Sequence, residues 1–296
     1  MILHANLDCE ARWAGVTLPV AVLERISLYG TLVSALGPDD TAHRELWTPA
    51  AVDAARIHLP WPVTLRTGTP DRADLAWADG AAARAANDRR LALGLCALPG
   101  ARAITSVDEI DLASWIVKLP WTAAGRDRCR GTGAPTAEQR VRIGRLLAIC
   151  GELVLEPWCD RIADAGVCAT VDGMTYPPHR LLSDPRGGFL GIDLAPPELL
   201  PDEHAELAAQ VASVRGAIAT TGYRGPFAID AFAYRDGDQR RFHPLCEINA
   251  RYSFGWIAHA LHARLGTTRL GFGTPPPGAR VLVSAAAGDP VSAWIA

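Results

Sequence analysis

The sequence predicts a mixed α/β protein of the α+β class, built from two or three domains or subdomains. The 296 residues are enough for a sizeable buried core. Hydrophobic residues make up 49% of the chain, which indicates a globular protein. Strand-like and helix-like segments alternate in the middle of the chain, and a long two-stranded pattern dominates the part that follows.

The first region, residues 1–95, is apolar and punctuated by proline. It contains one candidate amphipathic helix, whose apolar positions are Leu23, Ile26, Leu32, Val33 and Leu36. We expect this region to form a short N-terminal domain.

The second region, residues 96–155, is predicted to run strand, loop, helix, strand. The strands are "WIVKLP" and "ELVLEPW", and a loop rich in Gly and Arg follows the first. Thr136 and Gln139 form a capping-box pattern at the helix start. The apolar face of the helix consists of Ile143, Leu146, Leu147 and Cys150.

The third region, residues 156–296, is expected to contain both helices and strands. A helix over 202–220 carries Leu207, Val211, Val214 and Ile218 on one face. The stretch "PFAIDAFAYRDGDQRRFHPLCEINARY" reads as two strands around an Asp-Gly turn, and "FGWIAHALHARL" reads as a further helix.

Composition narrows the class of function. A net charge near −3 argues against a nucleic-acid surface. No apolar run is long enough to span a membrane, and the N-terminus lacks a signal-peptide pattern. Seven cysteines without CxxC pairs favour reduced thiols. We therefore expect a cytoplasmic protein with small-molecule partners, no nucleic acid and no membrane.

The second strand of the hairpin alternates, so that His243, Leu245, Glu247 and Asn249 would share one face. Asp230 on the first strand joins this face if the connecting loop has an even number of residues and no bulge intervenes. Two carboxylates and a carboxamide suit a hard cation, Mg²⁺ or Mn²⁺. No thiol or imidazole pair has a spacing typical of zinc sites. The alternative is an ordinary solvent-facing polar strand.

Lys118 is the only lysine beside 28 arginines, and it lies in an apolar strand directly before the Gly-containing loop. A compact ammonium beside exposed loop amides suits phosphate binding. The alternative is a lysine at a sheet edge whose charged end reaches solvent.

Taken in order, these motifs resemble the ATP-grasp superfamily of D-alanine–D-alanine ligase, glutathione synthetase and biotin carboxylase. The match runs from about residue 87 to about 265, and "EINAR" at 247–251 is its most specific part. The resemblance implies an ATP-grasp fold with a short N-terminal domain (1–95), a small lid subdomain (96–155) and a C-terminal antiparallel-sheet subdomain (156–296).

The resemblance also implies roles for residues. Adenine would dock at a hinge where the Pro157 carbonyl accepts from its amine and the Cys159 amide donates to a ring nitrogen. Asp160 or Asp164 would hold the ribose, and Asp164 is the assignment made here. The ATP-binding set is Lys118, Ala124, Gly125, Arg126, Glu156, Pro157, Trp158, Cys159 and Asp164.

One departure concerns a second phosphate-binding lysine that the superfamily usually has before the lid. The matching stretch "NDRRLALG" offers only Arg89 and Arg90, and Arg90 is the assignment made here. Arginine can bind phosphate bidentately, although with another geometry.

By the resemblance, Asp230, Glu247 and Asn249 would bind the metal, and Arg251 and Lys118 would be catalytic. The implied enzyme is a biosynthetic ligase that splits ATP to ADP and phosphate with Mg²⁺ or Mn²⁺. It would activate a carboxylate as an acyl phosphate, which an amine then attacks, on an amino acid or small peptide. The alternatives are a phosphotransferase without ligation and a non-catalytic nucleotide-binding module. A homodimer is left open.

Overall fold

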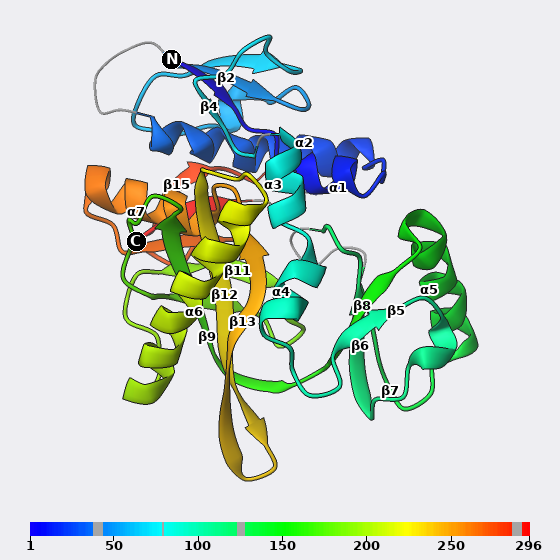
Figure 1. Cartoon of the computed structure of the whole chain (residues 1–296). Helices are drawn as coiled ribbons and strands as arrows, with labels where there is room; N and C mark the ends of the chain where they lie inside the picture. The colour runs from blue at the N-terminus through cyan, green and yellow to red at the C-terminus, as the bar shows by residue number, and fades with distance from the viewer. Residues whose placement is uncertain (38–43, 79, 123–127, 286–291) are drawn as a thin grey trace.

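The computed structural model describes residues 1–37, 44–78, 80–122, 128–285 and 292–296, and the structural statements below concern these residues. Their strands form three sheets, with helices packed against them (Figure 1). The predicted mixed α/β class is confirmed. No helix in the described ranges is both long and apolar enough to cross a membrane.

The N-terminal sheet is parallel, in the order β3-β2-β1-β4. The candidate helix of this region is in fact two elements: an α-helix ends at Gly30, and a 3₁₀ segment continues to Leu36. The hydroxyls of Thr31 and Ser34 donate to the carbonyls of Leu28 and Thr31, a competition that favours a tighter turn. The elements are β1 (Ile2–His4), α1 (Cys9–Trp13), α2 (Val20–Gly30), η1 (Thr31–Leu36), β2 (Glu45–Thr48), η2 (Ala54–Arg56), β3 (Thr64–Thr67) and β4 (Leu75–Ala76).

Two short helices connect this sheet to the next. They are α3 (Gly80–Ala86) and α4 (Arg89–Leu95), and the Asp88 side chain caps α4 by accepting from the Arg90 amide. Figure 1 shows α4 between the other two sheets.

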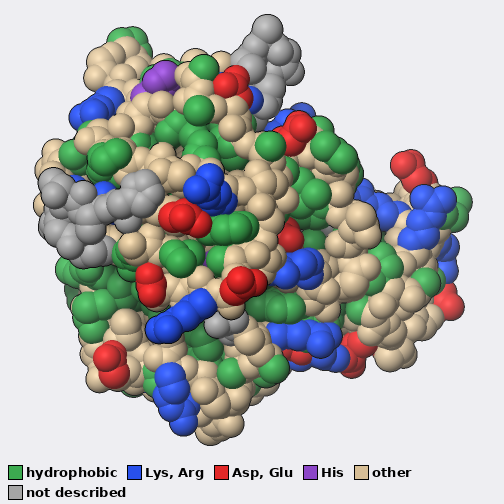
Figure 2. Space-filling view, turned by 90° about the horizontal axis from the view of Figure 1, so that it is seen from above, with side chains coloured by type: hydrophobic (Ala, Val, Ile, Leu, Met, Phe, Trp, Pro, Cys, Tyr) green, Lys and Arg blue, Asp and Glu red, His purple; other side chains and the backbone are tan. Residues whose placement is uncertain are grey.

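The second sheet, called the lid sheet, is antiparallel in the order β5-β8-β6-β7. The predicted capping box of Thr136 and Gln139 is present at the start of its helix. Ile143 and Leu146 pack with Trp115 in a core of the lid's own, and the lid projects as a separate lobe (Figure 2). Its elements are β5 (Arg102–Ile104), η3 (Val107–Glu109), β6 (Ser114–Lys118), β7 (Arg128–Thr132), α5 (Ala137–Cys150) and β8 (Leu153–Pro157).

The third, C-terminal sheet has eight strands in the order β13-β12-β9-β10-β11-β14-β16-β15, all antiparallel to their neighbours. The predicted apolar face of α6 packs on one side of it, against Val167, Ile229 and Ala231. Its elements are β9 (Asp160–Thr170), β10 (His179–Ser183), β11 (Phe189–Asp193), α6 (Pro201–Thr220), β12 (Pro226–Asp236), β13 (Gln239–Asn249), α7 (Phe254–Leu265), β14 (Arg269–Phe272), β15 (Arg280–Val283) and β16 (Ala293–Ile295).

The side chains that alternate with this apolar set point to the opposite face of the C-terminal sheet. On that face Cys168 and Ala228 pack under Trp256 of α7. Both groups of polar residues described below lie on the same face.

Candidate active site

The hairpin of β12 and β13 places Asp230 directly opposite Glu247. The turn between the strands holds two residues, an even number as the prediction requires. A bulge is nevertheless present, because Phe232 pairs with His243 and only one residue separates Asp230 from Phe232, whereas three separate His243 from Glu247. β13 thus has two more residues than β12 in this interval. Because side chains alternate with a period of two, an even excess keeps Asp230 and Glu247 on the same face.

The same bulge overturns the predicted position of Leu245. We expected Leu245 to share the face of Glu247, but it packs in the core with Ala231 and Ile248. Residues 244–246 of β13 all lie opposite the single residue Ala231, which breaks the alternation of side chains along β13. The Leu245 side chain therefore points toward α6, while Glu247 lies on the polar face.

Asn249 completes the predicted set of oxygen ligands on this face. It pairs with Ala228, two residues from Asp230, and its residue is 7% exposed. Burial, and next the negative charge of Glu247, raise the pKa of Asp230 to about 7. Two facing carboxyl groups and a carboxamide therefore fit a hard divalent cation, whose charge would relieve their repulsion.

The structure places Arg89, and not Arg90, beside these carboxylates. Arg89 is buried and donates to the carbonyl of Leu119, to the hydroxyl and carbonyl of Thr122, and to Oε1 of Glu247 at 2.8 Å. Arg90, to which the resemblance assigned the phosphate contact, pairs with Asp88 and Glu152.

Lys118 lies inside the lid sheet and not at its edge, since β6 pairs with β7 on one side and β8 on the other. Its ammonium donates to Oε2 of Glu156 at 2.6 Å, and the two side chains are 12% and 14% exposed. Burial acts to raise the pKa of Glu156, but the charge and hydrogen bond of Lys118 outweigh it and hold that pKa below its usual value. The alternative of a solvated edge lysine is therefore wrong.

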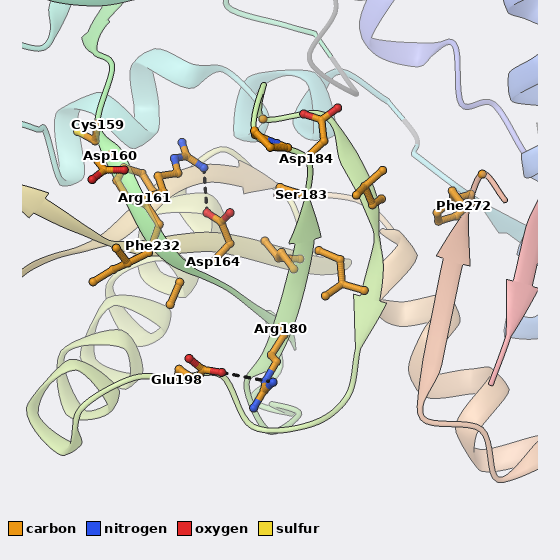
Figure 3. A pocket seen from close by; sticks show the side chains of 18 of the residues that line it. Cys159, Asp160, Arg161, Asp164, Arg180, Ser183, Asp184, Glu198, Phe232 and Phe272 are labelled. Carbon is orange, nitrogen blue, oxygen red and sulfur yellow. Dashed lines mark hydrogen bonds and ion pairs between the residues drawn. The ribbon is translucent and has the colours of Figure 1, made fainter. Parts of the chain in front are cut away.

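A cleft of about 1460 Å³ separates the lid sheet from the C-terminal sheet. Lys118, Glu156, Pro157, Trp158, Cys159, Asp160 and Asp164, all named from the sequence, line it. Figure 3 shows Asp164 turned toward Arg161, whose guanidinium is 3.1 Å away and lies 3.9 Å above the ring of Phe232. Sequence reasoning did not identify Arg161, because it is one of many arginines.

The open edge of β8 faces this cleft. The Trp158 amide donates to the Ser114 carbonyl on β6, so the Pro157 carbonyl points to the other edge of β8. The pairing of β5 with β8 reaches only as far as Leu155. In the described residues this carbonyl therefore has no strand partner, and the Cys159 sulfur lies 3.8 Å from it.

Arg251 connects this region to the N-terminal sheet. Its Nε and Nη2 atoms both lie 2.7 Å from Oε1 of Glu10, which is itself buried. Burial alone would lower the pKa of Arg251, but Glu10 raises it, so the guanidinium stays charged. No sequence pattern distinguishes Glu10, and its contact with Arg251 could not have been predicted.

A second hollow, of about 660 Å³, adjoins Glu10. It is lined by residues after β1, β3 and β4, at the carboxyl ends of parallel strands, where such sheets commonly bind ligands. Cys9 and three arginines, Arg12, Arg72 and Arg84, are among them. The predicted loop residues Ala124, Gly125 and Arg126 lie outside the described residues.

No protein-family model matches the sequence, and no curated protein matches it. Solved structures do. Biotin carboxylase from Campylobacter jejuni, solved as a β-γ-ATP complex, is 11% identical, with a TM-score of 0.57 over 99% of this chain and 86% of that chain. Pyruvate carboxylase from Rhizobium etli is 12% identical, with a TM-score of 0.57 over 99% of this chain and 35% of that chain.

D-alanyl-alanine synthetase A from Vibrio cholerae is 16% identical, with a TM-score of 0.48 over 64% of this chain and 63% of that chain. The chain thus spans less than two thirds of the synthetase and about a third of the pyruvate carboxylase. At these identities the likeness concerns the fold. The biotin carboxylase and pyruvate carboxylase are both ATP-grasp enzymes, and this protein has the ATP-grasp fold.

Proposed function

We propose that this protein is an ATP-dependent ligase that activates a carboxylate as an acyl phosphate for attack by an amine. The observation that carries the proposal is the register of β12 and β13, which sets Asp230 against Glu247 with Asn249 on the same face. Arg89 on Glu247 supplies a cation where the superfamily usually has a lysine. The ATP-grasp fold supports a nucleotide as the substrate of the cleft.

Adenine would lie at the open edge of β8, between the Pro157 carbonyl and the Cys159 amide. Asp164 would accept from the ribose hydroxyls, and its position on β9 in the lining of the cleft, beside Arg161, supports this role. Lys118 would meet the phosphates and exchange its contact with Glu156 for phosphate oxygens. Its compact ammonium suits that exchange in a place where little solvent enters.

In the reaction, a carboxylate oxygen attacks the γ-phosphorus and ADP leaves. The amine then attacks the acyl carbon, phosphate leaves and the amine loses a proton. When bound, Mg²⁺ would supply positive charge that offsets the repulsion between carboxylate and triphosphate. Asp230, Glu247 and Asn249 would hold it. Arg251, kept charged and oriented by Glu10, would stabilise charge developing on the acyl phosphate.

The acidic substrate would bind in the hollow of the N-terminal sheet. Arg12, Arg72 and Arg84 line that hollow together with Asp71, and this excess of cations suits an anionic ligand. Glu10, which pairs with Arg251, lies on α1 next to Cys9, and Cys9 lines this hollow. We therefore propose a small polyanionic or amino-acid carboxylate as the substrate class.

The experiment is a calorimetric titration with ATP, with and without Mg²⁺, followed by a screen for ADP and phosphate release over small acids. We expect Mg²⁺-dependent binding, and phosphate release that requires both a carboxylate and an amine. ADP with a stable phosphorylated product and no need for an amine would favour a phosphotransferase. Binding without turnover on any acid would favour a nucleotide-binding module. No binding at millimolar ATP would refute all three.

A further inference from the structure

A second group of ligand-type side chains lies on the same face of the C-terminal sheet. Cys168 comes from β9, His179 from β10 and His259 from α7, and one ligand atom from each lies within 4.8 Å of the others. Of the residues described, this is the group of Cys, His and acidic side chains whose geometry suits a metal ion. The proposed nucleotide chemistry uses none of the three.

The register separates this cluster from the carboxylates. His179 pairs with Gly166, and Gly166 pairs with Asp230 on its other side, so the three lie in one row across adjacent strands. Two strand spacings amount to about 10 Å. The Cys168–His179–His259 cluster is therefore a neighbour of the carboxylate pair and not part of it.

Two glycines make the space that the cluster occupies. A Cβ on Gly166 would lie 2.6 Å from Nε2 of His179. A Cβ on Gly255 of α7 would lie 2.8 Å from the Cys168 sulfur and 2.9 Å from the same Nε2. The backbones of β9 at Gly166 and of α7 at Gly255 therefore lie so close to the imidazole of His179 and the thiol of Cys168 that neither position has room for a side chain.

The protein leaves polar atoms of both imidazoles unpartnered. His179 is 2% exposed, and in the described residues neither its Nδ1 nor Nε2 of His259 has a hydrogen-bond partner. Buried polar atoms normally form a hydrogen bond, so two ring nitrogens without one in a single cluster are unusual.

We infer that Cys168, His179 and His259 form a binding site for one Zn²⁺ ion. A thiolate and two imidazoles form a ligand set of the kind that zinc prefers. Zinc bonds of this kind put ligand atoms about 3.5 Å apart, so the ion would draw the three atoms together by ~1 Å. The Ser253 hydroxyl, 3.8 Å from the Cys168 sulfur, or a water takes the fourth position.

Binding releases one proton. As the sulfur–zinc bond forms, the Cys168 thiol gives its proton to solvent, and the neutral imidazoles give none. The sulfur lies at the N-terminal turn of α7, beside Ser253 and Gly255. The ion joins β9 and β10 to α7, and thereby fixes the helix that follows Asn249 and Arg251 in the chain.

The test is a zinc titration of protein that has been stripped with a chelator under reducing conditions, in competition with a chromophoric chelator. We expect one equivalent of Zn²⁺, one proton released, and with Co²⁺ a tetrahedral visible spectrum with a thiolate-to-cobalt band. Cys168→Ser, His179→Gln and His259→Gln should each lower zinc affinity at least ~100-fold, since losing even an outer partner of a ligand can cost that much.

The matched controls are His262→Gln, on the same helix and hydrogen-bonded to the Thr267 carbonyl, and Cys129→Ser, buried in the lid. Both should bind zinc as the parent does. If the parent takes up no stoichiometric zinc, or if Cys168→Ser binds as tightly as Cys129→Ser, the inference is overturned and a buried water explains the orphan atoms.

Two measurements separate loss of zinc binding from misfolding and from failure of the nucleotide site. His259 is the least buried ligand, so His259→Gln and the Co²⁺ spectrum of the parent decide the matter even where a buried variant fails to fold. Calorimetry with Mg²⁺ and ATP on the same proteins tests the nucleotide site separately. We expect His259→Gln to retain ATP binding, so a failure of one proposal leaves the other intact.

Discussion

Two polar groups share one face of the C-terminal sheet and differ in how the protein treats them. Asp230 and Glu247 are acidic, and Arg89 is already bound to one of them. Cys168, His179 and His259 form a cluster without a carboxylate, and among the described residues Nδ1 of His179 and Nε2 of His259 have no hydrogen-bond partner. We propose that the acidic pair holds Mg²⁺ or Mn²⁺ and that the Cys168–His179–His259 cluster holds Zn²⁺. The two should therefore respond to different metals.

The largest effect is expected for the acidic pair. Glu247→Gln or Asp230→Asn should lower ATP-dependent phosphate release by about 10³-fold, because each removes a charged metal ligand. Higher Mg²⁺ or a change to Mn²⁺ should recover part of the loss, while zinc affinity stays that of the parent. If either variant turns over normally, or if it loses zinc binding instead, the two groups do not bind different metals as proposed.

Lys118→Arg should come next, with a loss of about 10²- to 10³-fold in turnover. The charge is kept, but the broader guanidinium does not fit between Glu156 and the phosphates in a place that is 12% exposed. Extra Mg²⁺ should not rescue it, and the melting temperature should stay within a few degrees of the parent. Arg140→Lys, at an exposed ion pair with Asp108, is the control. Parent-like turnover would show that the lone lysine has no special place.

Arg89 and Arg90 are adjacent in sequence and should differ in stability. Arg89→Lys cannot replace donors to Leu119, Thr122 and Glu247 together, and should lower the free energy of unfolding by about 2 to 3 kcal/mol. Arg90→Lys, at a half-exposed ion pair, should change it by no more than ~0.5 kcal/mol. Urea unfolding of both variants measures the difference, and equal effects would contradict the assignment of Arg89 to the site.

The last prediction concerns an effect that appears only in acid, at His243, which lies beside Phe232 at the bulge. Burial lowers its pKa from 6.5 to about 4. The unfolded chain therefore takes up a proton before the folded one does, and stability present above pH 6.5 is lost as pH falls toward 4.

In His243→Gln, the loss of unfolding free energy between pH 6.5 and pH 4 should be smaller than in the parent by up to about 3 kcal/mol. Each pH unit between the two pKa values contributes about 1.4 kcal/mol. Thermal unfolding from pH 8 to pH 4 gives the result. If the stability of His243→Gln falls with decreasing pH as steeply as that of the parent, other groups cause the pH dependence.

Local pattern determined much of this protein from the sequence. The capping box of Thr136 and Gln139, the apolar face of α6 and the hairpin around Gly237 all depend on residues a few positions apart, so periodicity reveals them. Lys118 stood out by composition alone. The parallel N-terminal sheet escaped prediction, because its strands of two to four residues are too short for a periodic signal.

Tertiary structure decided the rest. Arg89 and Arg90 differ only by the ~100° that separates neighbours on a helix, and the packing of α4 on β13 selects the one that meets Glu247. The bulge before Glu247 moved Leu245 into the core. Arg251 found Glu10 across the chain, and α7 brought His259 over Cys168 and His179. Such contacts join residues far apart in sequence, so they depend on the order of the strands and the packing of the helices, which no local spacing encodes.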